Sequence, residues 1–304
     1  MTRSPLVNGS TGQSPGAAEI GRPEWLDATA WPFPVRQVPT PSGPVSVTDV
    51  GTGTPILFVH TGFWSFVWRD VLLALPDGYR GVTLDAPGTG ASSRPAGSGI
   101  TLEHASAAIG AVMDHIDEPF TLVVHDLGGP AGLRAAADRP DQINGLVIVN
   151  AFGWQPSGFA FRTMLATMGS APMREFDAWT GMLPRASSTK LGVGRHFTRA
   201  DRKVFRSGID RQARRSFHRY MRSARKSRDL FVAIETAVAG PLAAKPVLTI
   251  FGEKNDPLGF QPKWKERFPA ARQLVIPDGM HFPMCDDPQF VTTALTRWHR
   301  EQIG

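Results

Sequence analysis

The sequence predicts an α/β fold: a mostly parallel sheet with helices on both faces and a helical cap inserted between two strands. Short apolar runs alternate with segments of helical periodicity, which is typical of parallel strands buried on both faces. The alternation stops after Ala151 and resumes at Pro246, and the intervening residues are helical, basic and rich in aromatic side chains. Because the sheet pattern continues after that stretch, we interpret it as an insertion into one core.

Four segments follow from this reading. Residues 1–22 are rich in Gly, Ser and Pro and lack the apolar stretch of a signal peptide, so we expect a flexible leader. Residues 23–151 and 246–304 form the predicted core, and residues 152–245 form the predicted cap.

The elements of the first core segment follow in order along the chain. Two weakly alternating segments, 34–40 and 44–51, are separated by Pro-Ser-Gly and predict an antiparallel start to the sheet. Thr101 is the expected N-cap of a helix with Glu103 in its first turn. The other expected elements are strand 55–62, helix 68–78, strand 79–85, helix 101–116, strand 121–126, helix 127–140 and strand 145–151.

The second core segment repeats the same alternation. After the cap we expect strands at 246–253 and 273–277 and a closing helix at 288–302. A buried strand on each side of the cap places both core segments in a single sheet.

The formal net charge of +6 is concentrated in the cap. Residues 195–228 hold 13 Lys and Arg against two Asp. Apolar residues recur there at helical spacing, which favours an amphipathic helix with a solvated basic face over a nucleic-acid site. A basic rim also favours anionic substrates. The apolar positions are Phe205, Ile209, Ala213, Phe217 and Met221.

Several classes of protein are disfavoured by composition. No stretch approaches the ~18 consecutive apolar residues of a membrane span, so no membrane partner is expected. The lone Cys285 excludes an internal disulfide, and with no export signal it predicts a cytoplasmic location. No Cys/His cluster has metal-ligand spacing, so we expect neither a metal nor another cofactor. The sequence carries no signal for the oligomeric state.

A candidate reactive group lies where the strand 121–126 ends. The segment TLVVHDLGGPA carries Asp126 out on a strand-to-helix corner, followed by Leu127 and two glycines. In a parallel sheet this corner lies at the carboxyl ends of the strands, where ligands bind. The turn is so sharp that its neighbours must be small, which accounts for Gly128 and Gly129.

At these residues the chain resembles the α/β-hydrolase superfamily, with Asp126 where G-x-S-x-G enzymes carry Ser. The HD-x-GG form is similar to the aspartate-nucleophile branch of epoxide hydrolases and haloalkane dehalogenases. The resemblance covers residues 22–151 and 246–304, whereas the cap is matched only in position and helical character. It implies an α/β-hydrolase fold and a triad in the order nucleophile, acid, histidine.

The resemblance extends to the two other triad positions. Asp256 follows a predicted strand in PVLTIFGEKNDP, and His281 lies in the loop before the last helix. Glu253 is an alternative acid, and Asp278 is a weaker one because it lies so close to His281 in sequence. The acid position after strand 145–151, used by some dehalogenases, holds Asn150, which favours Asp256.

An Asp nucleophile suits displacement at saturated carbon, because it forms an alkyl ester on the enzyme. His281, oriented by Asp256, then activates a water that attacks the ester carbonyl. The resulting oxyanion needs backbone N–H donors, which we expect from Leu127 and from Thr61 or Gly62.

The leaving group separates the two families of the branch. Dehalogenases usually hold halide with a Trp directly after the nucleophile and an Asn or Trp in the loop after the first buried strand. Leu127 and Thr61 or Gly62 stand at those positions here, with Trp64 left as a substitute donor. Epoxide hydrolases instead use hydroxyl donors from the cap, typically two Tyr. The chain has two Tyr, and Tyr220 alone lies in the predicted cap.

The sequence therefore predicts an epoxide hydrolase acting on a bulky apolar or aromatic small molecule. Trp154 and Trp179 are candidate second donors through their indole N–H groups, with pocket lining as the alternative for each. Phe63, Trp64 and Phe217 complete the predicted substrate-binding set. A haloalkane dehalogenase is the alternative. A small-molecule receptor or a non-hydrolytic biosynthetic enzyme is the alternative from another class.

Overall fold

The computed structural model describes residues 18–19, 22–93 and 100–304, so most of the predicted leader lies outside the described residues. Within this part of the chain, nine strands form one sheet in the order β1-β2-β3-β5-β4-β6-β7-β8-β9. The pairs β1/β2, β2/β3 and β3/β5 are antiparallel, and all later pairs are parallel. This confirms the predicted mostly parallel sheet with an antiparallel start.

Eight of the nine strands lie close to their predicted positions, whereas β1 was not predicted and falls within residues 1–22, which were expected to be a flexible leader. Their bounds are β1 (Ala18–Glu19), β2 (Arg36–Val38), β3 (Val45–Gly51), β4 (Gly53–His60), β5 (Gly78–Leu84), β6 (Phe120–Asp126), β7 (Ile143–Ala151), β8 (Val247–Gly252) and β9 (Arg272–Ile276). The central strands β4, β6, β7 and β8 are almost entirely buried, as their continuous apolar runs require.

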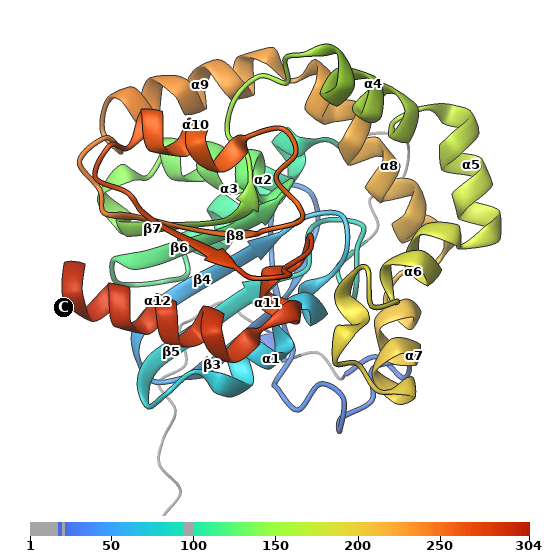
Figure 1. The fold of residues 1–304 in the computed structure, drawn as a ribbon. Helices are drawn as coiled ribbons and strands as arrows, with labels where there is room; N and C mark the ends of the chain where they lie inside the picture. The colour runs from blue at the N-terminus through green and yellow to red at the C-terminus, as the bar shows by residue number, and fades with distance from the viewer. Residues whose placement is uncertain (1–17, 20–21, 94–99) are drawn as a thin grey trace, which may run out of the picture.

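Helices cover both faces of the sheet (Figure 1). One layer contains α2 (Leu102–Met113), α3 (Gly128–Ala137) and α9 (Arg228–Ala239). The other contains α1 (Arg69–Ala74) and α12 (Pro288–Gln302), which pack against each other. The side chain of Thr101 accepts a hydrogen bond from the His104 N–H, which confirms the predicted N-cap of α2.

Two short helices were missed by sequence reasoning. They are α10 (Phe260–Arg267) and α11 (Pro283–Asp286). Each is short and carries a proline near its start, so neither presents a long apolar stripe.

The cap helices lie together at one end of the sheet (Figure 1). They are α4 (Phe159–Met168), α5 (Ala171–Thr180), α6 (Met182–Ser187), α7 (Arg199–Ser207) and α8 (Arg211–Lys226). Helices α4 and α5 pack against α8, whereas α9 returns to pack against α3. The division into core and cap at residues 152 and 245 remains a prediction.

The amphipathic helix predicted from Phe205 to Met221 is two helices. Its five apolar side chains are all buried, as expected. The prediction of one continuous helix was wrong, because α7 ends at Ser207 and Asp210 begins α8 by accepting a hydrogen bond from the Ala213 N–H.

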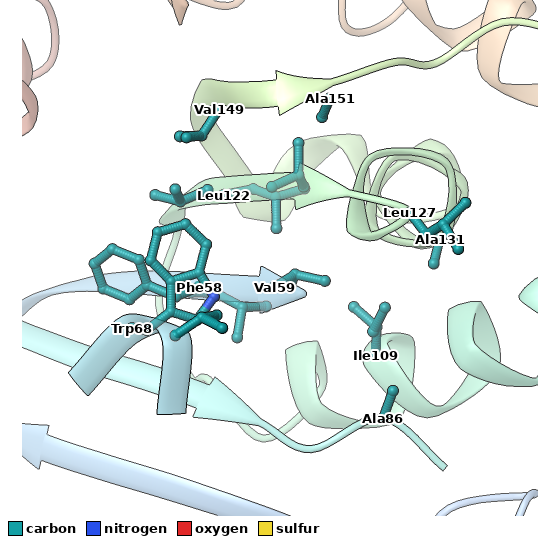
Figure 2. Packing of buried hydrophobic residues seen from close by; sticks show 14 of the residues in the cluster. Phe58, Val59, Trp68, Ala86, Ile109, Leu122, Leu127, Ala131, Val149 and Ala151 are labelled. Carbon is teal, nitrogen blue, oxygen red and sulfur yellow. The ribbon is translucent and has the colours of Figure 1, made fainter. Parts of the chain in front are cut away.

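The core beneath the reactive corner is built from the three central strands (Figure 2). Phe58 and Val59 of β4, Leu122 of β6 and Val149 of β7 are fully buried. Leu127 is also buried, directly after the end of β6. Dense packing around this corner holds the backbone of the site in place.

Candidate active site

Asp126 lies at the tip of β6. Its backbone has a φ of 50°, which is unusual for a residue other than glycine. Positions 128 and 129, which follow Leu127, have no space for larger residues. A Cβ on Gly128 would lie 2.6 Å from the Val59 carbonyl oxygen, and one on Gly129 would lie 2.4 Å from that of Phe152. Close backbone packing therefore requires both glycines at this corner.

His281 faces Asp126 from the loop after β9. Its Nε2 lies 3.9 Å from Oδ1 of Asp126, which is too long for a direct hydrogen bond but places the two groups at one site. Burial raises the pKa of Asp126, while the charge of His281 and a hydrogen bond from the Leu127 N–H oppose that shift. Both side chains keep some access to solvent.

The partner of His281 is not the one predicted. Nδ1 of His281 lies 3.0 Å from Nδ2 of Asn255. The carboxylate of Asp256 instead accepts hydrogen bonds from the N–H groups of Phe260 (2.6 Å) and Gln261 (2.9 Å) and caps α10. The sequence missed this because Asn255 and Asp256 are adjacent, and only the backbone path of the loop decides which one faces the imidazole.

The other acid candidates are occupied elsewhere. Glu253 accepts a hydrogen bond from the Asp278 N–H at 2.9 Å, and Asp278 forms an ion pair with Lys254. Asn150 donates to the carbonyl oxygens of Met280 (2.9 Å) and His281 (3.0 Å). The amide of Asn150 therefore holds the backbone of the histidine loop rather than its imidazole.

Two of the predicted oxyanion donors follow the ends of neighbouring strands: Thr61 comes directly after β4, and Leu127 comes directly after β6. His60 and His125 are paired residues of β4 and β6, so Thr61 and Asp126 leave the sheet side by side. The Leu127 N–H already points at the Asp126 carboxylate. Oγ1 of Thr61 is fully buried and has no hydrogen-bond partner among the described residues. An unpaired buried hydroxyl is costly to the folded state.

Phe63 and Phe217 lie together above this loop. Their rings stack at 5.5 Å, and Phe63 also stacks on Phe282 at 6.0 Å. A Cβ on Gly62 would lie 2.9 Å from the Phe217 ring, so this glycine lets the cap approach the core. Phe282, which follows His281, is an apolar contact that sequence reasoning missed.

The other predicted substrate contacts are used in packing. Tyr220 is fully buried and donates its hydroxyl to the Pro87 carbonyl oxygen at 2.7 Å. The Trp64 indole donates to the Phe205 carbonyl oxygen at 2.9 Å. Trp154 packs against Trp264 of α10.

Trp179 is exposed, unlike the three buried aromatic residues described above. Its side chain is 67% exposed on the cap surface, with the Arg211 guanidinium 3.8 Å above the ring. Of the four predicted aromatic donors, Tyr220 and Trp64 therefore have their polar groups bonded to carbonyl oxygens, and Trp179 lies at the cap surface.

A pair of buried histidines beneath the site was also missed. Nδ1 of His60 lies 3.0 Å from Nδ1 of His125, and Nε2 of His125 lies 2.7 Å from the His281 carbonyl oxygen. Nε2 of His60 accepts the Phe63 N–H. These contacts assign one proton to each ring, at Nδ1 of His60 and Nε2 of His125. Burial lowers the pKa of His60 to about 3, with a further contribution from His281.

Features of two other kinds of protein are absent from the described residues. No group of three or more His, Cys, Asp or Glu side chains is arranged to hold a metal ion. No helix in this part of the chain is long and apolar enough to cross a membrane.

The chain is similar to curated enzymes over most of its length. It is 28% identical over 282 residues to haloalkane dehalogenase 2 of Mycobacterium tuberculosis, covering 88% of this chain and 96% of that protein. It is also 28% identical over 265 residues to the cis-3-alkyl-4-alkyloxetan-2-one decarboxylase of Shewanella oneidensis, covering 83% of each.

Solved structures share the fold. The epoxide hydrolase CorEH superposes with a TM-score of 0.75 at 18% identity, over 88% of this chain and 99% of that one. The haloalkane dehalogenase DbeA from Bradyrhizobium elkani gives 0.75 at 16% identity, over 88% and 98%. The profile of the alpha/beta hydrolase fold family matches residues 54–288. The chain therefore belongs to the alpha/beta hydrolase fold family, in the branch with an aspartate at the position of Asp126.

Proposed function

We propose that Asp126 attacks a saturated carbon of a strained oxygen ring, an epoxide in the first instance, and forms an alkyl ester that His281 helps to hydrolyse. The observation that carries this proposal is the carboxylate of Asp126 on a strained corner, 3.9 Å from the imidazole of His281. Leu127 offers no side-chain donor for a halide at the next position, whereas ring strain assists the departure of an alkoxide.

In the first step an oxygen of Asp126 bonds to the ring carbon, and the carbon–oxygen bond of the ring breaks. The ring oxygen leaves with the electron pair and takes up a proton from water. The unpaired hydroxyl of Thr61 is the donor that we assign to this oxygen, because the indole of Trp64 and the hydroxyl of Tyr220 are already bonded to carbonyl groups.

In the second step water attacks the ester carbonyl while His281 Nε2 takes its proton. The bond between the carbonyl carbon and the alkyl oxygen then breaks, and the product leaves as a diol after its oxygen takes that proton from His281. The new carboxyl group of Asp126 loses its proton to the solvent, which replaces the one taken from water in the first step.

Proton uptake by His281 Nε2 requires the tautomer with the proton on Nδ1. The structure places the amide nitrogen of Asn255 against Nδ1, which favours the tautomer with the proton on Nε2, so the amide must turn its oxygen to the ring before His281 can act as the base. In either orientation Asn255 supplies no negative charge to stabilise the imidazolium. We therefore propose that ester hydrolysis is the slow step.

The neutral side-chain amide of Asn255 beside His281 also suits a second reaction, the decarboxylation of a lactone. The oxetan-2-one decarboxylases among the relatives act on a four-membered lactone by name. Attack of Asp126 on the alkyl carbon of such a ring would break the carbon–oxygen bond and leave a carboxylate on the neighbouring carbon. Loss of carbon dioxide then forms an alkene and expels Asp126 unchanged. That sequence needs no activated water, so the neutral Asn255 would not slow it.

Trapping the ester separates these reactions. The His281→Ala variant is incubated with styrene oxide, 1-bromohexane or a cis-3,4-dialkyloxetan-2-one, and Asp126 is examined by peptide mass spectrometry. An adduct of the whole epoxide supports the leading proposal. Alkene and carbon dioxide from the lactone alone support the second reaction. Bromide release with a hexyl adduct supports dehalogenation, as the dehalogenase relatives suggest.

The Asp126→Asn variant is the matched control, because it keeps the shape of the side chain and removes the nucleophile. Absence of any adduct or turnover in every arm would favour a receptor on this fold. For the substrate we propose an apolar group held against Phe63, Phe217 and Phe282. A cytoplasmic location remains part of the proposal, consistent with the free, buried thiol of Cys285.

A further inference from the structure

An open pocket of about 610 Å³ lies where the cap meets the start of α2. Four cationic side chains line it: Arg174 from α5, and Arg219, Arg222 and Lys226 from α8. The single lining carboxylate is that of Glu103 in the first turn of α2. The pocket is therefore strongly positive and has walls from both the cap and the core.

Glu103 offsets one of the four positive charges but forms no ion pair with any of these cations. Burial raises its pKa, but hydrogen bonds from Ser227 and Thr101 outweigh burial, so the net shift is downward and the carboxylate stays ionised. The Ser223 hydroxyl also lies 3.4 Å from it. Among the described residues, no carboxylate lies within ion-pair distance of Arg219, Arg222 or Lys226.

Arg219 is the least satisfied of these cations. Its Nη1 is buried and has no hydrogen-bond partner in the part of the chain that the structure describes. Burial lowers the pKa of Arg219, and repulsion from Arg174 and Arg215 lowers it further. Glu175 is the nearby anion, but it already pairs with Arg174 at 3.0 Å and Arg215 at 2.7 Å. The cluster thus lacks negative charge.

This pocket is separate from the candidate active site. Phe217 of α8 packs on Phe63 next to Gly62. Arg219 and Lys226 lie two and nine residues further along the same helix. At about 100° per residue they project from the opposite side of α8.

We propose that this pocket is a second binding site for a small phosphate-bearing anion, which bridges cap and core. One guanidinium group can donate two parallel hydrogen bonds to two oxygens of a phosphate group. A phosphate group also brings up to two negative charges to one place. The first-turn N–H groups of α2 contribute little, because Leu102 donates to Ser223 and His104 to Thr101. The four cations therefore supply the binding, and this proposal does not depend on the reaction at Asp126.

Phosphate binding in this pocket can be tested by calorimetry and thermal unfolding of the full chain. The probes are pyrophosphate, inorganic phosphate and citrate, at constant ionic strength. We expect pyrophosphate to bind and to raise the unfolding temperature, because binding to the folded state alone stabilises it. Citrate should bind more weakly. No binding of either phosphate probe, or binding of citrate alone, would contradict the proposal.

Variants locate the site. Arg219→Gln combined with Arg222→Gln should weaken pyrophosphate binding by about tenfold or more, because two charge-assisted contacts are lost. Lys226 is exposed, so Lys226→Gln should fold normally and weaken binding several-fold. Arg206→Gln on the exposed side of α7 removes the same charge outside the pocket and should bind as the unmodified chain does. An equal loss in Arg206→Gln, or none in the other variants, would show that the anion binds elsewhere.

Discussion

The side-chain amide of Asn255 lies 3.0 Å from Nδ1 of His281, at the position where a catalytic histidine usually meets a carboxylate. In serine proteases the corresponding change from carboxylate to amide lowers kcat by about 10⁴, largely because the imidazole takes the wrong tautomer. Asn255→Asp should therefore accelerate decay of the alkyl ester by at least about tenfold. Single-turnover mass spectrometry of the Asp126 adduct measures this decay directly.

Asp256→Asn is the control for that change. It alters the neighbouring carboxylate, which caps α10 through Phe260 and Gln261 and does not reach His281. We expect it to leave ester decay unchanged while lowering stability by about 1 kcal/mol. If Asp256→Asn slowed ester decay and Asn255→Asp did not change it, Asp256 would be the acid after all.

The pH dependence of alkylation reports on Asp126. Burial raises its pKa above the ordinary 3.8, and the charge of His281 partly opposes this. Only the ionised carboxylate attacks, so the alkylation rate should fall as the pH drops through the raised pKa. In His281→Ala the opposing charge is gone, so the fall should begin at higher pH. Adduct formation followed between pH 4 and 8 tests this, and a rate independent of pH over that range would contradict it.

Substitution of Tyr220 tests whether its hydroxyl serves packing or catalysis. Its hydroxyl donates to the Pro87 carbonyl oxygen at 2.7 Å, and burial raises its pKa, so it remains protonated. Tyr220→Phe should cost about 1–1.5 kcal/mol of stability, because one buried hydrogen bond is lost. It should leave the alkylation rate within about twofold. A tenfold slower adduct formation with an epoxide would restore Tyr220 as the donor to the leaving oxygen.

The parts of the site that the sequence could predict are those that lie within one continuous segment of the chain. Asp126, Gly128 and Gly129 lie in one continuous strand–turn–helix segment, whose apolar run and glycines define the geometry locally. The alternation of strands and helices likewise predicted the sheet, because burial on both faces leaves a continuous apolar run.

Contacts between distant segments were not predictable in the same way. Whether Asn255 or Asp256 faces His281 depends on a few backbone dihedrals in the loop after β8. Tyr220 turns towards Pro87 because that carbonyl needs a donor in the buried seam between cap and core. Neither relationship leaves a periodic signal in the sequence.

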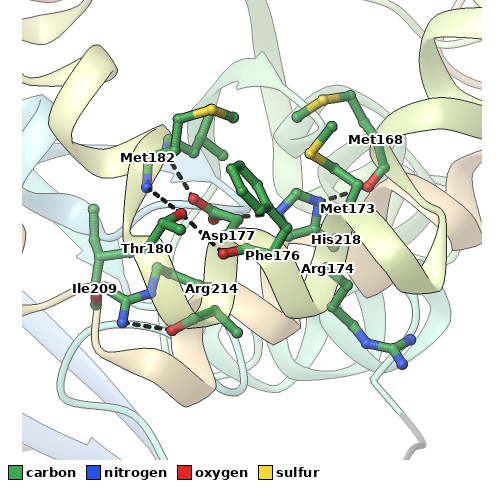
Figure 3. A network of polar contacts seen from close by, with 12 residues as sticks. Met168, Met173, Arg174, Phe176, Asp177, Thr180, Met182, Ile209, Arg214 and His218 are labelled. Atoms are coloured by element: carbon green, nitrogen blue, oxygen red, sulfur yellow. Dashed lines mark hydrogen bonds and ion pairs between the residues drawn. The ribbon is translucent and has the colours of Figure 1, made fainter.

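The cap contains a fully buried pair, Asp177 and His218 (Figure 3). Nδ1 of His218 lies 2.5 Å from the Met168 carbonyl oxygen and Nε2 lies 3.2 Å from Oδ2 of Asp177. Asp177 also accepts the Leu183 N–H at 2.7 Å, which ties α5 to α6. Asp177→Ala should cost about 3–5 kcal/mol, because it leaves a buried imidazole without its partner.

Chemical denaturation measures that loss. Adding His218→Leu to Asp177→Ala should recover part of it, because the double variant leaves no unpaired polar ring in the cap. Strictly additive losses in the two variants would show that the pair is not coupled.

The His60–His125 pair should make the fold sensitive to acid. Burial lowers the pKa of His60 from 6.5 to about 3, and it lowers that of His125 as well, with the charge of His281 contributing to both. The unfolded chain therefore binds protons at these rings below pH 6.5 that the folded chain does not bind. Stability is fully present above pH 6.5 and is lost as the pH falls from 6.5 towards 3, by up to about 1.4 kcal/mol per pH unit for each ring.

Unfolding free energies measured from pH 7 to 4 should show this decline. His60→Asn removes one titrating ring, so its decline should be shallower even though its stability at pH 7 is lower. An identical decline in the variant would mean that other groups cause the loss, and that His60 does not have to remain neutral for the chain to fold.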